Sequence, residues 1–397
     1  MAAAGAATLA LRPREGQIEP AEVEPRAYFS ADELGRARDF SRPQRVLALT
    51  GMGLSGATLA LVALRPPRRL RRALQGGRPY RTGAAAGAGI VLVLGAVTLP
   101  IAAIAHERSR DVGLATQDWP AWLGDVVKSE AISAVFAAAG GALLMVLVRR
   151  FPRRWWIAGA GAVVGISLLF TYISPVVLEP IFNKFEPLPA GPLRSDVLSL
   201  AGRSGVDVGE VYRVDASRRT TGVNAYVNGI GHTKRVVLYD NLIERFSRDQ
   251  VDSVVAHELA HVRHRDVPRG LLWLVIVAPA ATLLVQRLTE RMAGPDAALE
   301  SGGANALAVP AVALSLALVS TVLGVASNSL SRSVERSADA YALNLTSDPA
   351  AFIAVERQLA VENVGDPDPP AWVQLLFGTH PTTVDRIGAA LSWSRAH

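Results

Sequence analysis

The sequence predicts a mostly α-helical membrane protein with about six transmembrane helices, a compact α+β insertion and a C-terminal helical segment. Three observations support this fold class. Half of the 397 residues are hydrophobic. Only 19% are charged, whereas a soluble domain usually has about 25%. The apolar residues also gather in long uncharged runs, and a helix needs about 20 residues to cross the hydrocarbon core.

Composition excludes several classes of protein. The net charge of +6 comes almost entirely from arginines beside the apolar runs. This pattern is typical of membrane flanks and does not indicate a nucleic-acid-binding surface. The chain has no cysteine, which excludes disulfides, thiolate metal sites and cysteine nucleophiles. Residues 1–45 lack the basic start of a signal peptide, so we expect them to be retained as a mobile tail.

Six uncharged runs are the candidate membrane spans. The first four form a membrane region, residues 46–184, and the last two fall within residues 270–327. The fourth run opens with a Trp-Trp pair suited to the membrane interface. The fifth is short enough to be a buried core helix instead. In chain order the runs are Val46–Leu64, Gly83–Ala105, Ala131–Val148, Trp155–Leu178, Gly270–Val285 and Ala306–Ser327.

The α+β insertion is predicted at residues 185–269. Three pieces read as strands, and glycines between the last two predict a hairpin. Ser247 and Gln250 have the spacing of a capping box, which begins a helix. The C-terminal segment, residues 328–397, is soluble-looking and helical, and it is broken by GDPDPP at 365–370. The predicted strands lie at 211–217, 224–230 and 235–242.

The predicted helix contains the motif HELAH, with His257, Glu258 and His261. On a helix the two histidines lie one turn apart on the same face, so both imidazoles can bind one ion. Glu258 is rotated by about 100° from His257, so it can reach a water molecule without ligating the metal. This is a gluzincin-like arrangement, in which the glutamate acts as general base. The alternative is a water-exposed helix with two unremarkable histidines.

A catalytic zinc ion needs a third protein ligand and one open position. The segment SNSLSRSVERSADAYAL, residues 327–343, offers Glu335 and, four residues later, Asp339. On one helix face Glu335 can complete the ligand set, while Asp339 holds a ligating imidazole in its proper tautomer. The alternative for this segment alone is a surface helix with ordinary charges. Together with the HELAH motif it predicts one Zn²⁺ per chain.

The order of HELAH, NSLSRSVERSAD and THPTTVDRI (379–387) resembles that of the membrane-embedded CAAX prenyl endopeptidases. These are the a-factor-converting zinc metalloproteases, and heat-shock membrane proteases are close relatives of them. The resemblance covers roughly residues 30–395. It implies that His257, His261 and Glu335 bind zinc and that Glu258 is the catalytic base. It also implies that Asp339 hydrogen-bonds a zinc-binding histidine without binding the metal itself. It further implies a cytoplasmic catalytic face, whereas the denser basic residues of the opposite face, in 65–82 and 149–154, favour the reverse orientation. The best-known eukaryotic members have one more N-terminal span than we predict here.

Other residues fit the chemistry of a peptidase. Asn224, Ala225 and Tyr226 lie on a strand that could form an exposed edge, where a peptide substrate can pair by strand addition. His380 could donate a hydrogen bond to the oxyanion that develops on the scissile carbonyl. Arg386, six residues later, is a further candidate for substrate binding. The plainer alternatives are an ordinary strand, a His-Pro helix start and a structural arginine.

These observations predict a multi-pass zinc endopeptidase, monomeric in the lipid bilayer, that acts on membrane-associated or lipidated peptides and proteins and binds no nucleic acid. Two alternatives stay open. One is a heat-shock-type protease that removes damaged membrane proteins by the same chemistry. The other is a catalytically inactive membrane scaffold on the same fold, although a scaffold has no need of Glu258. Asn328 and Arg332, before Glu335, are predicted to organise its helix.

Overall fold

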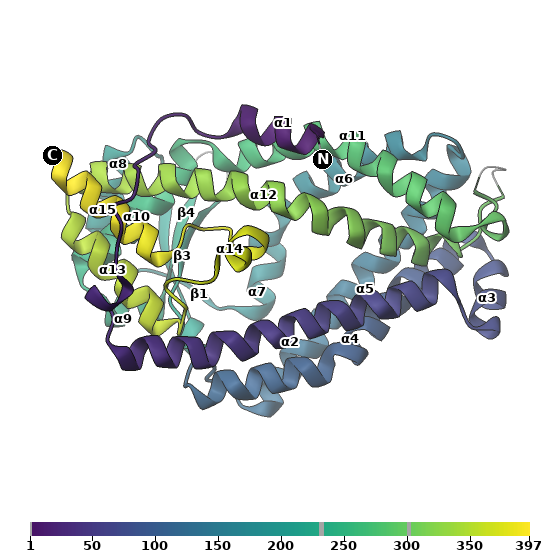
Figure 1. The fold of residues 1–397 in the computed structure, drawn as a ribbon, viewed down its shortest axis with the longest axis horizontal. Helices are drawn as coiled ribbons and strands as arrows, with labels where there is room; N and C mark the ends of the chain where they lie inside the picture. Colours follow the sequence, from purple (N-terminus) through teal and green to yellow (C-terminus); the bar gives the residue numbers. More distant parts are fainter. Residues whose placement is uncertain (1, 230–233, 300–302) are drawn as a thin grey trace.

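The computed structural model describes residues 2–229, 234–299 and 303–397. Long helices run side by side along the molecule, and the sheet and the C-terminal helices gather at one end (Figure 1). In the described residues, six helices are long and apolar enough to cross a membrane, which confirms the predicted number. They are α2 (Ala31–Leu64), α4 (Pro79–Asp111), α5 (Trp119–Arg150), α6 (Trp155–Ile173, which continues as a π-helical segment, Ser174–Leu178, into α7, Glu179–Phe182), α11 (Asp266–Ala293) and α12 (Ala308–Thr346).

The helices extend beyond the apolar runs, because capping and not hydropathy sets where they begin. α2 starts at Ala31, well before Val46, where Ser30 and Glu33 form a reciprocal capping box. Many large apolar side chains on these helices are exposed in the isolated chain, including Val135 at 67% and Leu61 at 58%. Such exposure in a helix of this composition is what contact with lipid requires.

α4 and α5 form a close-packed pair because glycines line their contact. A Cβ atom on Gly87 would meet the carbonyl oxygen of Ala137, and one on Gly141 would meet the carbonyl oxygen of Gly83. Small residues let helix backbones approach closely where no hydrophobic effect drives association in lipid. The glycines therefore fix how these two membrane helices pack.

The N-terminal residues are packed, which corrects the prediction of a mobile tail. α1 (Ala2–Leu11) lies along α11 and α12 (Figure 1), and its Ala4 and Ala7 are buried. Trp273 Nε1 of α11 donates a hydrogen bond to Thr8 Oγ1 at 3.1 Å. Small alanine side chains let α1 lie close to its neighbours, a contact that the local sequence does not reveal.

The insertion contains a four-stranded sheet in the order β1-β2-β4-β3. β3 and β4 pair antiparallel, as the predicted hairpin requires, although residues 230–233 of its turn lie outside the described part. β2 pairs parallel with β4, and the unpredicted β1 pairs antiparallel with β2. β3 is consequently an edge strand. The strands are β1 (Phe185–Pro187), β2 (Glu210–Val214), β3 (Ala225–Asn228) and β4 (Arg235–Tyr239).

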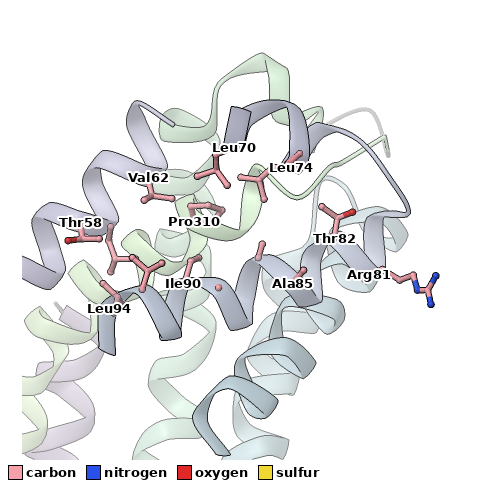
Figure 2. Close-up of a pocket in the computed structure, with 15 residues that line it drawn as sticks. Thr58, Val62, Leu70, Leu74, Arg81, Thr82, Ala85, Ile90, Leu94 and Pro310 are labelled. Atoms are coloured by element: carbon pink, nitrogen blue, oxygen red, sulfur yellow. The ribbon is translucent and has the colours of Figure 1, made fainter. Parts of the chain in front are cut away.

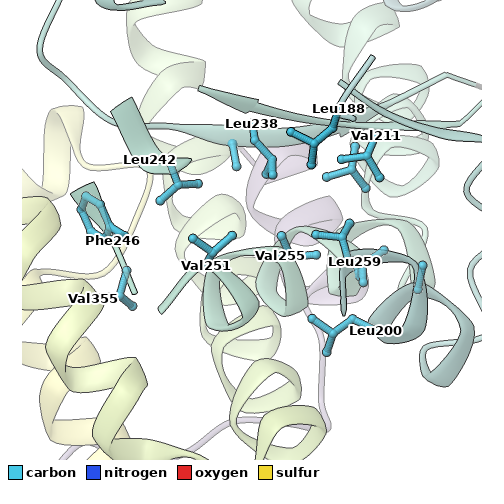
Figure 3. Close-up of a cluster of buried hydrophobic side chains, with 14 of the residues drawn as sticks. Leu188, Leu200, Val211, Leu238, Leu242, Phe246, Val251, Val255, Leu259 and Val355 are labelled. Atoms are coloured by element: carbon cyan, nitrogen blue, oxygen red, sulfur yellow. The ribbon is translucent and has the colours of Figure 1, made fainter. Parts of the chain in front are cut away.

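The core of the insertion lies between this sheet and two helices, α8 (Pro192–Arg203) and α10 (Arg248–Arg263) (Figure 3). α10 begins at the predicted capping box of Ser247 and Gln250. It buries Val251, Val255 and Leu259, which recur every four residues and so share one face. Burial of that face against the sheet leaves another face of α10 for the two histidines.

α12 joins the membrane bundle to the insertion. Its 39 residues extend over about 58 Å at 1.5 Å per residue, so one helix both crosses the bundle and packs against α10. The remaining elements are short. They are α3 (Arg68–Gln75), α9 (Asp240–Arg245), α13 (Pro349–Glu362), α14 (Ala371–Phe377), α15 (Thr383–Ala396), and single turns at Pro25–Ala27, Ala216–Arg218 and Pro295–Ala297.

Candidate metal centre and active site

His257 and His261 of α10 converge with Glu335 of α12. The two Nε2 atoms lie 3.2 Å apart, and His257 Nε2 is 3.1 Å from Glu335 Oε2. The other carboxylate oxygen, Oε1, is 3.7 Å from His261 Nε2. One donor atom from each of the three residues lies within 4.8 Å of the other two. The tertiary fold thus brings together three residues that are up to 78 positions apart.

Each imidazole is oriented by a carboxylate on its other nitrogen. Asp339 Oδ1, one helical turn after Glu335, lies 2.8 Å from His257 Nδ1. Asp266 Oδ2, the first residue of α11, lies 3.0 Å from His261 Nδ1. Sequence reasoning missed Asp266. The sequence feature that could have identified it is an acidic residue five positions after the second histidine, at the break between two helices.

The break itself positions Asp266. α10 ends at Arg263, and Arg265 takes a left-handed conformation, with φ 56°. A non-glycine residue rarely adopts this conformation unless its surroundings hold it there. The turn directs Asp266 back toward His261, and Asp266 also forms an ion pair with Arg269 on the next turn of α11.

The donor set fits a metal ion. With each Nδ1–H donating to a carboxylate, both Nε2 atoms carry a lone pair, and these face each other and the Glu335 carboxylate. Three acceptors at hydrogen-bond distance with no donor between them repel one another, and a cation at their centre removes that repulsion. Two imidazoles and one carboxylate are the ligands of a catalytic zinc site with an open position.

Arg386 of α15 supports the site from behind. Its Nε lies 2.9 Å from Asp339 Oδ2, and one terminal nitrogen lies 2.5 Å from Asp339 Oδ1. The other terminal nitrogen lies 2.7 Å from Glu356 Oε1 of α13. Burial raises the pKa of Glu356 to about 7, while the Arg386 charge opposes that rise. Arg386, a candidate for substrate binding, therefore holds two buried carboxylates, although it also lines the cavity described next.

A cavity of about 190 Å³ opens on the His257 side of the site. Glu258 lines it, and burial raises the pKa of this carboxyl, because a charged carboxylate is poorly solvated there. Asn224 and Ala225, at the start of edge strand β3, line the same cavity. Tyr226 does not, and its hydroxyl donates a hydrogen bond to Glu179 Oε2 at 3.0 Å.

His380 also lines this cavity, from the loop between α14 and α15. Its Nε2 lies 3.3 Å from Glu335 Oε2, and its side chain is 59% exposed. α12 holds the loop through Arg332, which donates to the carbonyls of Gln374 at 3.0 Å and Gly378 at 2.6 Å. Asn328 Nδ2 donates to the Leu376 carbonyl at 2.8 Å. The residues predicted to organise the Glu335 helix thus organise the His380 loop.

Comparison with known proteins assigns this arrangement to a family. Residues 187–394, which include every residue of the site, match the model of peptidase family M48. This chain belongs to that family. Residues 108–184 match the CAAX prenyl protease N-terminal model, described as five membrane helices. Since M48 peptidases are metal-dependent, the family confirms a membrane metallopeptidase.

Curated relatives agree with the M48 assignment. The chain is 29% identical over 376 residues to the "Uncharacterized metalloprotease YhfN" of Bacillus subtilis, covering 93% of this chain and 88% of the relative. It is 29% identical over 275 residues to a CAAX prenyl protease 1 homolog of Oryza sativa, 68% of this chain and 63% of that one. It is 36% identical over 146 residues to CAAX prenyl protease 1 of Saccharomyces cerevisiae, 35% and 31% of the two chains.

The fold has a solved counterpart. The crystal structure of S. mikatae Ste24p matches over 98% of both chains, with a TM-score of 0.76 and 18% identity. At 18% identity the match shows only that the two folds are alike. It confirms the predicted architecture of a helical membrane bundle that carries a small sheet.

Proposed function

We propose that this M48 metallopeptidase is an integral-membrane zinc endopeptidase that hydrolyses peptide bonds of membrane-associated or lipidated proteins. The observation that carries the proposal is the convergence of His257, His261 and Glu335 beside Glu258, in a cavity bordered by an edge strand. The three residues hold one Zn²⁺, which when bound acts as a Lewis acid toward the scissile carbonyl and the attacking water.

Glu258 is the general base. It follows His257 directly on α10 and lines the cavity, so its carboxylate lies beside the ligands and is not one of them. Burial raises the pKa of its carboxyl, which makes the carboxylate a stronger proton acceptor. Glu258 accepts a proton from the attacking water and then passes it to the leaving amine. No covalent intermediate with the chain forms.

His380 and β3 bind the reacting peptide. The exposed imidazole of His380 lies beside Glu335 and can donate a hydrogen bond to the oxyanion. β3 pairs with β4 on one side, which leaves its other edge for a substrate strand. Asn224 and Ala225 at its start keep the bound backbone next to Glu258. Arg386 supports this wall of the cavity.

A membrane-associated substrate is supported by a second, larger cavity of about 930 Å³. It extends from Tyr172 at the end of α6 and Val176 in the π-helical segment that follows, across the sheet at Tyr212 and Arg235, to His261. A chain leaving the membrane bundle beside α6 would therefore reach His261, one of the three candidate ligands. The names of the plant and yeast relatives indicate prenylated substrates, and we propose the same broad class here.

Replacing Glu258 with glutamine tests the mechanism. Glu258→Gln keeps the size of the side chain but cannot accept a proton, so peptide cleavage should fall by at least about 100-fold. Its zinc content, measured by elemental analysis, should equal that of the native chain. Glu244→Gln, on the exposed surface of α9, is the matched control. Native-rate cleavage by Glu258→Gln would refute the mechanism, and loss of zinc would make Glu258 a ligand.

Proteomics can identify the substrate. Membrane proteins or peptides that accumulate uncleaved in cells with Glu258→Gln, relative to cells with the native chain, are its substrates. Accumulation of prenylated or other lipidated chains supports the proposal. Accumulation of unrelated misfolded membrane proteins would indicate the quality-control alternative, and an unchanged proteome would indicate the inactive scaffold.

We further propose that the catalytic face is cytoplasmic, as the resemblance implies. Because the chain has no cysteine, single introduced cysteines can report orientation. Lys184→Cys lies at the catalytic end, where its side chain is 72% exposed, and Gln75→Cys lies at the exposed end of α3. A membrane-impermeant maleimide should label only Gln75→Cys in intact cells. The reverse result would place the metal site outside.

A further inference from the structure

A third cavity lies at the end of the bundle that is remote from the candidate metal site. It encloses about 480 Å³ between α2 and α4, and α3 and the start of α12 close it (Figure 2). This volume lies within the range of about 300–1,000 Å³ typical of ligand sites. The lining is almost wholly apolar and includes Val62, Leu70, Leu74, Ile90, Leu94 and Pro310.

The cavity is too far from the catalytic site to be part of it. Pro310 lines the cavity and Glu335 binds the metal, and both belong to the continuous helix α12. They are 25 positions apart, which corresponds to about 38 Å of helix and exceeds the roughly 30 Å hydrocarbon thickness of a membrane. An occupant of this cavity therefore lies at the opposite membrane surface from the scissile bond.

The segment that borders the cavity, residues 65–82, is strongly basic, and we call it the basic rim. Residues 65–82 contain seven arginines and no acidic residue, and all seven are exposed. Leu70 and Leu74 direct α3's apolar side into the cavity, whereas Arg81 points away from it (Figure 2). Arg71 lies 3.4 Å from Asp296, and among the described residues it is the one arginine of the seven with an ion pair. Exposed positive charge thus lies next to the apolar space, although of the seven arginines only Arg81 is among the residues that line it.

We propose that this cavity binds an anionic phospholipid. One acyl chain lies between α2 and α4 against Ile90 and Pro310, and the phosphate pairs with the arginines of α3. Apolar burial combined with a basic rim is the chemistry that recognises an anionic lipid rather than a zwitterionic one. The bound lipid ties the α2–α3–α4 hairpin to the start of α12.

Filling the cavity tests the proposal. A Cβ atom added at Gly89, which lines the cavity, would meet no atom within 4 Å, so Gly89→Leu occupies the acyl-chain space without a clash. Gly53→Leu on α2 is the matched control, because Gly53 has the same open surroundings but does not line the cavity. A monodisperse gel-filtration peak for each variant shows that it has folded.

The readout is the phospholipid that remains bound after reconstitution in vesicles of phosphatidylglycerol and phosphatidylcholine and re-extraction in detergent, measured by mass spectrometry. The native chain and Gly53→Leu should retain about one phosphatidylglycerol each, and Gly89→Leu should retain none. Equal retention by both glycine variants would overturn the proposal. So would a lipidated peptide, in place of a phospholipid, recovered from native membranes.

The basic rim has its own test. Replacing Arg68, Arg69 and Arg72 with glutamine removes three charges from α3 and leaves the apolar lining intact. Each basic residue near an anionic surface strengthens binding about fivefold, so the triple variant should bind phosphatidylglycerol about 100-fold more weakly. Its binding of phosphatidylcholine should not change. Unchanged affinity for phosphatidylglycerol would show that the arginines do not select the lipid.

Discussion

Replacing Asp339 with alanine removes two interactions at once, and the structure predicts the size of each. The first is the contact of 2.8 Å with His257 Nδ1. Loss of a carboxylate that hydrogen-bonds a metal-binding histidine lowers metal affinity by about 10–100-fold. The second is the pair of hydrogen bonds from buried Arg386. Breaking a buried ion pair costs about 3–5 kcal/mol, and we expect the lower end because Arg386 keeps Glu356 at 2.7 Å.

Asp266→Ala is the matched comparison, because Asp266 makes the equivalent contact with His261 Nδ1 at 3.0 Å. We expect a similar loss of metal affinity. Its other partner, Arg269, is 24% exposed and can turn to water, so this pair should contribute at most about 1 kcal/mol to stability. The two variants should therefore match in metal affinity and differ in the stability of the metal-free protein.

The assay has two parts. Competition with a chromophoric zinc chelator gives metal affinity, and thermal unfolding of the metal-free protein in detergent gives stability without the contribution of bound ligand. The expected result is weaker zinc binding in both variants and a clearly lower melting temperature for Asp339→Ala alone. Unaltered zinc affinity in Asp339→Ala, or equal destabilisation by Asp266→Ala, would refute the roles assigned to these carboxylates.

Three further predictions address the ligands, the oxyanion and the bundle. Elemental analysis should show loss of stoichiometric zinc on replacing any one ligand with alanine; a variant that keeps its zinc would remove that residue from the set. His380→Ala should keep zinc but lower kcat by about 10²–10³; a change confined to KM would contradict an oxyanion role. Gly141→Ala should destabilise the protein by about 1–3 kcal/mol, because its Cβ meets the Gly83 carbonyl, whereas Gly140→Ala meets nothing; equal melting temperatures would argue against this packing. The variants for the first of these three predictions, on zinc content, are His257→Ala, His261→Ala and Glu335→Ala.

Much of the architecture could be predicted because its signals are local. Uncharged runs of nearly 20 residues indicate spans whatever their neighbours, since the bilayer requires it. The Ser247–Gln250 capping box and the β3–β4 hairpin depend on residues close in the chain, and the structure contains both. The spacing of HELAH places two imidazoles on one helix face. Glu335 is identified by the second motif, NSLSRSVERSAD, which follows HELAH in the order that the family resemblance gives.

Other features could not be predicted, because they depend on which distant surfaces meet. The short strand β1 exists through its pairing with β2, and three residues carry too weak a pattern to be recognised alone. The alanine-rich N-terminus reads as a tail until α11 and α12 supply the surface that buries it. Tyr226 belongs to the predicted edge strand, but strand alternation directs its hydroxyl to Glu179, away from the cavity.

The sequence by itself determined the membrane bundle, the sheet-bearing insertion and the residues that can hold a metal, since these follow from hydropathy, periodicity and motif spacing. The tertiary structure alone decided how that site is supported. Asp266 reaches His261 because a left-handed turn at Arg265 reverses the chain. Arg386 joins Asp339 to Glu356 because α12, α13 and α15 meet there. Those contacts arise from packing between separate helices, which no local pattern encodes.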